Sequence, residues 1–220
     1  MSEVPAVCFL IMKKITAIKV QRNRPSRVNI YLDGEFAFGL ARIAAAWLKN
    51  GDELSDEKIA RLIEEDAREW AYQQALLLLG SRARSENEIR QNLKKHGVSP
   101  EVITAALERL RQTGLVNDDD FARAWVENRS TFRPRSGKAM AAELRQKGLD
   151  ERVIQESLSG VDEESLAYGA ASKRAVRLKG LKWEEFRAKL GGFLLRRGFS
   201  YSVAASTVAR IWKETQAEAR

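Results

Sequence analysis

One sixteen-residue stretch of the chain occurs twice. The segment RARSENEIRQNLKKHG covers residues 82–97, and RPRSGKAMAAELRQKG follows it by 51 residues, at 133–148. Five of the sixteen positions are identical, including both arginines, the serine and the final glycine. Repetition at a fixed period is typical of chains built from stacked copies of one small helical unit, because each copy buries its apolar face against the next. The repeat therefore constrains the fold more than any other feature.

Three glycines mark the period along the chain: Gly97, Gly148 and Gly198, spaced 51 and 50 residues apart. A leucine lies four residues before each glycine, an apolar residue directly after it, and Ser or Asp one position further on. Glycine supplies the left-handed residue that ends a helix, the apolar residue packs back on that helix, and Ser or Asp caps the next one. Apolar residues 5 and 10 positions after each glycine share one helical face. The pattern predicts three helix–glycine–helix turns.

A further helical segment precedes each pair of helices: EWAYQQALLLLGSR, DDDFARAWVENR and ESLAYGAASKRAVRL. The predicted fold is mainly α, with three tandem three-helix repeats at residues 70–116, 117–160 and 161–215. The third repeat differs from the others, because its middle segment, KWEEFRAKLGGFLLRRG, lacks the Arg-x-Arg-Ser opening.

The first part of the chain has the pattern of strands. Residues Ile15–Gln21 and Arg27–Leu40 alternate apolar with polar positions, with turn signals at Asp33-Gly34 and Asn23–Ser26. We expect a small antiparallel β-sheet of two or three strands and only helices after Ala41, which together make residues 12–69 an N-terminal region. Met12 followed by two lysines resembles an alternative start, so residues 1–11 are expected to be an upstream extension.

Composition and motifs exclude several classes of function. The apolar run at Val4–Met12 is too short to span a bilayer, so we expect no membrane partner. The single cysteine gives neither a disulfide framework nor a zinc ligand set, so we expect a cytoplasmic protein with no metal. No nucleotide-binding loop or nucleophile motif is present. The only histidine, His96, lies among lysines at a helix end, and Asp118–Asp120 fit the start of a helix better than a metal site. We predict no enzyme activity and no cofactor.

Positive charge is concentrated near the C-terminal end. Residues 166–213 carry 11 Lys and Arg against Glu184 and Glu185, a local net charge of +9 in a chain whose total is +8. Such a surface is expected to meet phosphates or an acidic protein groove. Arginines in front of a helix N-terminus also suit anions. The candidate partner- or DNA-binding residues are Arg82, Arg84, Arg129, Arg133, Arg135, Lys138, Lys173, Arg174, Arg177, Lys179, Lys182, Arg196 and Arg197.

These residues also have a structural interpretation. The arginines before the first two middle helices have acids nearby, such as Glu86, Glu88 and Glu127, with which they can form ion pairs. The cations of the third repeat have too few local acids to be neutralised in that way. The five tryptophans have helical spacing, which favours packing over base stacking for most of them.

Three motifs in order resemble the RecX family of bacterial recombinase modulators: RARS at 82–85, GLVNDDDFARAWV at 114–126 and ELRQKG at 143–148. The resemblance covers about residues 70–213, and the N-terminal MKKITAIKVQ is similar to that of longer members. It implies a regulator, acting as a monomer, that binds the groove of the filament of RecA recombinase on single-stranded DNA. It also implies inhibition of the ATPase, strand exchange and co-protease activities of RecA, and a place in DNA repair, recombination and the SOS response. The resemblance supplies no catalytic residues.

Two other functions remain open from the residues. The chain has the charge expected of an autonomous nucleic-acid-binding protein that acts through its basic third repeat. It is also compatible with a helical scaffold for another acidic partner.

Overall fold

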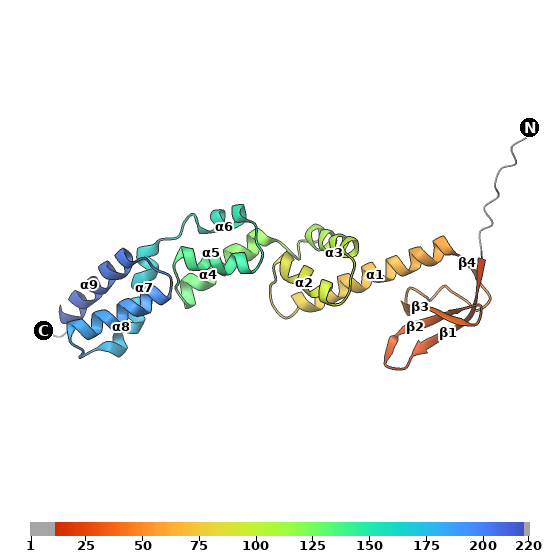
Figure 1. The fold of residues 1–220 in the computed structure, drawn as a ribbon, viewed down its shortest axis with the longest axis horizontal. Helices are drawn as coiled ribbons and strands as arrows, with labels where there is room; N and C mark the ends of the chain where they lie inside the picture. Colours follow the sequence, from red (N-terminus) through yellow and green to blue (C-terminus); the bar gives the residue numbers. More distant parts are fainter. Residues whose placement is uncertain (1–11, 218–220) are drawn as a thin grey trace, which may run out of the picture. The chain divides into compact units, whose positions relative to one another are not determined.

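The computed structural model describes residues 12–217, in which nine α-helices follow a small antiparallel sheet (Figure 1). The chain divides into two compact units. Of the described residues, the N-terminal unit contains 12–80 together with 92–112, and the C-terminal unit contains 81–91 and 113–217. The expected extension at 1–11 lies outside the described residues.

The sheet has four strands in the order β3-β2-β1-β4, with all neighbours antiparallel. The strands are β1 (Met12–Gln21), β2 (Arg24–Leu32), β3 (Glu35–Ala41) and β4 (Glu53–Ser55). The predicted turn at Asp33-Gly34 is confirmed, because Leu32 pairs with Glu35 and both turn residues have positive φ, 51° and 95°. Two-residue turns of this kind match the twist of the flanking strands.

Three expectations about this region are wrong. The sheet has four strands instead of two or three, because the three-residue strand β4 is too short to show alternation. This strand also lies in a stretch that was expected to be helical. The β1–β2 turn consists of Arg22 and Asn23, so Pro25 and Ser26 belong to β2. Val20 pairs with Val28 and Gln21 with Arg24, which leaves a bulge opposite β1. A bulge is one of the few places where a strand accepts proline.

One continuous helix, α1 (Asp56–Leu79), packs on the sheet and then forms the first helix of repeat 1. It crosses the boundary drawn between residues 69 and 70 from the sequence. The core beneath its first half includes Ile15, Ile30, Leu40 and Leu62, all less than 5% exposed. The remaining helices are α2 (Glu86–Lys95), α3 (Pro100–Gln112), α4 (Asp118–Phe132), α5 (Gly137–Gln146), α6 (Glu151–Leu158), α7 (Glu163–Ala175), α8 (Trp183–Arg196) and α9 (Tyr201–Ala217), with a 3-10 turn, η1 (Val176–Leu178), after α7.

The three glycine turns are confirmed. Gly97, Gly148 and Gly198 have φ of +77°, +78° and +90°. After each glycine, the next N–H donates to the carbonyl of the leucine four residues before the glycine, at 3.3 Å in all three turns. This is the Schellman arrangement, in which a left-handed residue lets the chain satisfy the last carbonyls of a helix. The repeat seen in the sequence is therefore a repeat in the backbone.

Candidate polyanion interface

The start of α2 is tied to the turn that ends α5. Ser85 Oγ accepts the N–H of Glu88 at 3.3 Å and donates to the carbonyl of Lys147 at 2.7 Å. A Cβ added to Gly148 would lie 2.2 Å from the side-chain amide nitrogen of Asn87, so the Asn87 side chain packs directly on the backbone of Gly148. We call this contact the first junction.

The second junction is the equivalent contact one repeat later. Ser136 N–H donates to the carbonyl of Arg197 at 3.1 Å, and a Cβ added to Gly198 would lie 2.5 Å from Ser136 Oγ. The serine and glycine of the repeat therefore do more than cap helices, because they also join the middle helices of successive repeats.

The expected anion sites at these helix starts are filled from within the chain. The first N–H of α2, on Glu86, donates to Asp118 at 2.9 Å, and the first N–H of α5, on Gly137, donates to Glu163 at 2.6 Å. Asp118 and Glu163 are the first residues of α4 and α7, so each repeat supplies the anion for the preceding middle helix. This use of Asp118 agrees with the interpretation of Asp118–Asp120 as helix-start acids, with Asn117 as the N-cap.

Charge is balanced by a carboxylate at the first junction. Glu88 accepts two hydrogen bonds from Arg82, at 2.7 and 3.0 Å, and one from Lys147 at 2.7 Å. These donors, Arg82 first, lower the pKa of Glu88 to about 2 against the opposing effect of burial. Arg82 therefore pairs within the chain.

The second junction lacks that carboxylate. Ala139 occupies the position of Glu88, and Arg197 that of Lys147. Arg197 donates to the Pro134 carbonyl at 2.9 Å, and its guanidinium lies 4.7 Å from the centre of the Phe193 ring. Burial lowers the pKa of Arg197, and repulsion from Arg135 and Arg133 lowers it further.

Four arginines gather at this place. Arg174 lies on the same ring as Arg197, 5.9 Å from its centre. Arg135 shares the carboxylate of Glu143 with Arg129, at 2.9 and 2.7 Å, so two cations divide one negative charge. Within the described residues, Arg133, Arg174 and Arg197 form no ion pair with any acid. We call Arg133, Arg135, Arg174, Arg197 and Phe193 the junction cluster.

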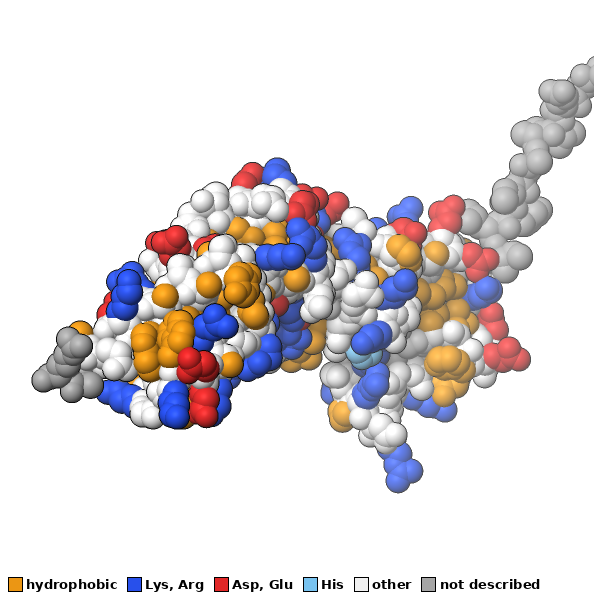
Figure 2. Space-filling model, turned by 60° about the vertical axis from the view of Figure 1, so that its left-hand side comes forward, with side chains coloured by type: hydrophobic (Ala, Val, Ile, Leu, Met, Phe, Trp, Pro, Cys, Tyr) orange, Lys and Arg blue, Asp and Glu red, His pale blue; other side chains and the backbone are white. Residues whose placement is uncertain are grey.

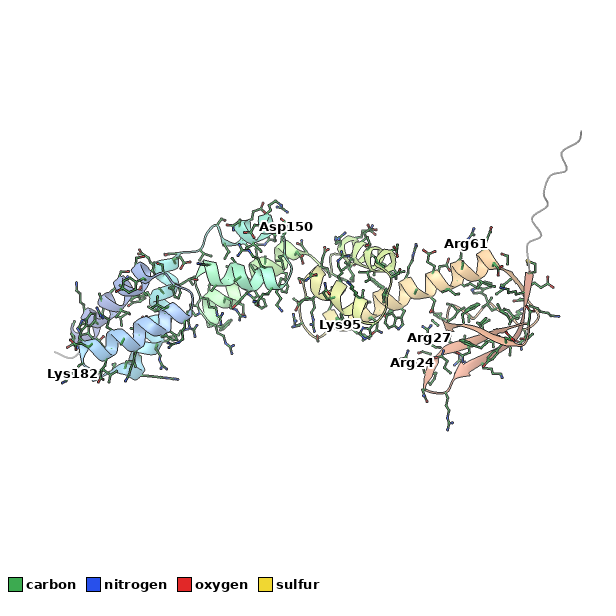
Figure 3. All side chains as sticks on the ribbon, in the orientation of Figure 1. Arg24, Arg27, Arg61, Lys95, Asp150 and Lys182 are labelled. Atoms are coloured by element: carbon green, nitrogen blue, oxygen red, sulfur yellow. The ribbon has the colours of Figure 1, made fainter. Side chains whose placement is uncertain are left out.

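The other predicted residues divide into two groups. Lys173 and Arg196 lie next to cluster members in the chain, and Lys138 is exposed in the first turn of α5. Arg177 lies in η1, and Lys179 follows it directly. Lys182 precedes the start of α8 (Figure 3), roughly 20 Å from Arg196 along that helix. The basic residues of the third repeat therefore do not form a single patch. Arg84 is bound to Ser81 at 3.3 Å, and its Nε is buried without a hydrogen-bond partner.

Aromatic residues mostly serve packing, as expected. Trp183 and Trp212 contact each other in the core of repeat 3, and Trp125 donates its indole N–H to Glu143 at 2.8 Å. Phe193 was missed by sequence reasoning, since a phenylalanine in an apolar helix resembles core. The signal for it was a pair of arginines without nearby acids, Arg197 four residues after Phe193 and Arg174 on the preceding helix.

The junction cluster has the chemistry of a polyanion site. Guanidinium groups bind phosphate or carboxylate through paired N–H donors, and the phenyl face between two of them suits an apolar or aromatic group. The repulsion acting on Arg197 would be relieved by a bound anion.

Within residues 12–217 the structure contains no group of side chains suited to a metal, and none of the helices in this range could cross a membrane. Figure 2 shows blue Lys and Arg side chains interspersed with orange apolar groups on the face in view.

Family models for RecX proteins match the chain in four successive stretches. The N-terminal domain of regulatory protein RecX matches residues 13–55, and the first, second and third RecX three-helix domains match 71–110, 117–158 and 162–207. A regulatory protein RecX from Bacillus licheniformis is 34% identical over 205 residues, 90% of this chain and 77% of that protein. One from a Mycobacterium species (strain KMS) is 37% identical over 157 residues, 66% of this chain and 83% of its own length.

Two solved structures are similar as well. A crystal structure of a regulatory protein RecX has a TM-score of 0.61 at 31% identity, over 87% of this chain and 96% of that one. The crystal structure of RecX from Lactobacillus salivarius is similar in fold, with a TM-score of 0.58 at 21% identity over 66% of this chain and 97% of that one.

Proposed function

The chain belongs to the RecX family of regulatory proteins, and from that membership we propose that it regulates the RecA recombinase. It does so without an enzyme activity of its own, by binding the groove of the RecA–DNA filament. The main effect is inhibition of ATP hydrolysis, strand exchange and co-protease activity.

The observation that supports this proposal is the junction cluster. Its guanidinium groups come from three places in the chain, the α4–α5 loop, α7 and the end of α8, and those of Arg174 and Arg197 lie over one phenyl ring. A filament offers two kinds of anion to such a cluster, the DNA phosphates and acidic side chains on the groove walls. The Ser136 N–H bond to the Arg197 carbonyl and the Arg197 side-chain bond to the Pro134 carbonyl hold the start of α5 and the end of α8 together, so the cluster is preorganised before binding.

The test is the DNA-dependent ATPase rate of RecA, measured as this protein is added. We expect the rate to fall as the protein approaches stoichiometry with the filament. The variant R133E/R174E should require about tenfold more protein, which corresponds to about 1.4 kcal/mol, because neither group forms an ion pair with an acid of residues 12–217. The matched control K182E/K213E carries the same charge change at the start of α8, where the neighbouring Trp183 and Trp212 contact each other, roughly 20 Å along that helix from Arg197, and it should inhibit like the wild type. No inhibition by wild-type protein in excess over filament contradicts the proposal.

The same cluster favours a second function, autonomous binding of nucleic acid. That function predicts DNA binding in the absence of RecA at roughly 0.15 M salt, with affinity falling steeply as salt rises because bound counterions are released. Loss of this binding in R133E/R174E together with an unchanged RecA ATPase rate would favour it over the regulator.

A further inference from the structure

The N-terminal unit contains a groove that neither the family nor the junction cluster accounts for. Its volume is about 1020 Å³, and it lies between the start of β2, the loop after β3, the middle of α1 and the turn after α2. The residues that matter for its chemistry are Arg24, Arg42, Trp70 and His96, together with Asp66 and Glu69. We call it the sheet–helix groove.

The two acids of the groove, Asp66 and Glu69, already accept hydrogen bonds from other residues of the chain. Asp66 is 7% exposed and accepts hydrogen bonds from Arg27 at 2.7 Å and from the Ala41 N–H at 2.6 Å, which ties the sheet to α1. Glu69 accepts from Gln73 and from Arg109, each at 2.8 Å, and these two partners lower its pKa in that order. Neither carboxylate is left to neutralise another cation.

The remaining cations of the groove have no such partner. Arg24 and Arg42 are exposed, and neither forms an ion pair with any described acid. Lys94 and Lys95 are exposed next to His96 in the last turn of α2 and also lack ion pairs there. Figure 2 shows the pale-blue histidine flanked by blue side chains, and Figure 3 places Arg24 and Arg27 below α1, with Lys95 at the end of α2.

An aromatic side chain lies in the groove with one partner. Trp70 is half-buried, and its ring centre is 6.0 Å from that of His96, with the rings tilted by 60°. His96 Nδ1 is fixed by a 2.8 Å hydrogen bond to the Asn92 carbonyl, which sets the direction of the imidazole. Trp70 lines two adjoining cavities of this unit, so part of its ring borders open space.

The glycine turn at Gly97, beside Trp70, is not covered by another helix, whereas the equivalent turns at Gly148 and Gly198 are. The turns at Gly148 and Gly198 are covered by the start of the preceding middle helix. A Cβ added to Gly97 would meet no described atom within 4 Å, because no repeat precedes repeat 1. The backbone of residues 96–99 therefore lines the second cavity, next to Arg24 and Trp70.

We propose that the sheet–helix groove is a binding site for single-stranded nucleic acid. Arg24 and Arg42 bind successive phosphates, and an unstacked base lies against Trp70 beside His96. Free cations around an aromatic platform are the combination that binds single strands, since every base has a π-face and every nucleotide a negative charge. A recess between a strand and a helix admits a flipped-out base, whereas a duplex keeps its bases stacked inside. An acidic peptide would use the same arginines but would not need the indole.

The test uses the full chain without RecA, so its result is separate from that of the proposed function. A fluorescent oligothymidylate carrying 5-iodouracil at one position is titrated with protein, irradiated, and the cross-linked peptides are identified by mass spectrometry. We expect cross-links at Trp70 or His96. The variant R24E/R42E should lose them and bind about tenfold more weakly. The control K49E/R61E carries the same charge change outside the groove, with Arg61 on the other side of α1 (Figure 3), and should bind within about twofold of wild type.

A second variant separates nucleic acid from an acidic peptide. W70L should weaken oligothymidylate binding by about fivefold or more, as expected for the loss of one stacked base, and leave binding of a poly-glutamate peptide unchanged. Any one of three results would overturn the proposal. These are cross-links found only outside the groove, equal binding of oligothymidylate by R24E/R42E and K49E/R61E, and a preference of the groove for poly-glutamate over oligothymidylate. Circular dichroism of every variant checks that the fold is intact.

Discussion

Replacing Glu88 with glutamine tests whether the first junction depends on one carboxylate. Glu88 is 17% exposed and accepts hydrogen bonds from both Arg82 and Lys147. Lowering its pKa from 4.5 to about 2 corresponds to an interaction free energy of about 3 kcal/mol. Arg82 is 44% exposed, so solvent screens part of that energy. We therefore expect E88Q to lower the free energy of unfolding by about 2 kcal/mol at neutral pH.

The pH dependence of this difference follows from the direction of the shift. A carboxylate whose pKa is depressed in the folded protein stabilises it fully above the unfolded pKa, near 4.5, and progressively less as the pH falls toward about 2. The gap between wild type and E88Q should therefore be constant from pH 7 to about 5 and should shrink below pH 4.5.

The assay is urea unfolding at a series of pH values, followed by circular dichroism. The control is E127Q, because Glu127 is an exposed residue of α4 that forms no ion pair with any described residue. A difference below about 0.5 kcal/mol at pH 7, which is the range of ordinary surface substitutions, would refute the role of Glu88. A gap that does not change between pH 7 and pH 3 would refute its electrostatic origin.

Two further substitutions test the packing of the repeats and of the sheet. G97A and G148A both place a side chain at positive φ, which costs about 1–2 kcal/mol. Only G148A also drives a Cβ into Asn87, so its melting temperature should fall further than that of G97A. Equal decreases in melting temperature would contradict the close contact between Gly148 and Asn87. D66N should destabilise the N-terminal unit by about 3 kcal/mol, because it leaves Arg27 half-buried without its carboxylate. Hydrogen exchange of the β2 and β3 amides measures this loss, and unchanged protection would contradict it.

The sequence predicted the local structure of the repeats well, because that structure depends on neighbouring residues. Glycine ends each middle helix and the Ser or Asp two positions later caps the next helix, so spacing alone located all three turns. The short strand β4 was not predictable in this way. It exists only because Met12 to Lys14 lie beside it, and even the nearest pairing, of Lys14 with Glu53, joins residues 39 positions apart.

The site was predictable only in part, for the same reason. Arginines before a helix were expected to face a partner, yet Arg82 pairs with Glu88 inside the chain and Ser85 contacts Lys147, 62 residues away. One signal was present in the two aligned segments, where Glu88 is replaced by Ala139. That single difference marks the junction at which charge is left unbalanced. The sheet–helix groove gave no signal, because its cations and its tryptophan come from distant elements.

Substituting Ala139 with glutamate tests the central claim most directly, namely that an unbalanced second junction binds the filament. A139E places at the second junction the carboxylate that Glu88 supplies at the first, within reach of Arg197 as Glu88 is of Lys147. The control A205E adds the same charge on the exposed face of α9. We predict that A139E folds with unchanged or higher stability and inhibits the RecA ATPase about fivefold more weakly, for an ion pair of about 1 kcal/mol. Inhibition by A139E equal to that by A205E and wild type would contradict the account.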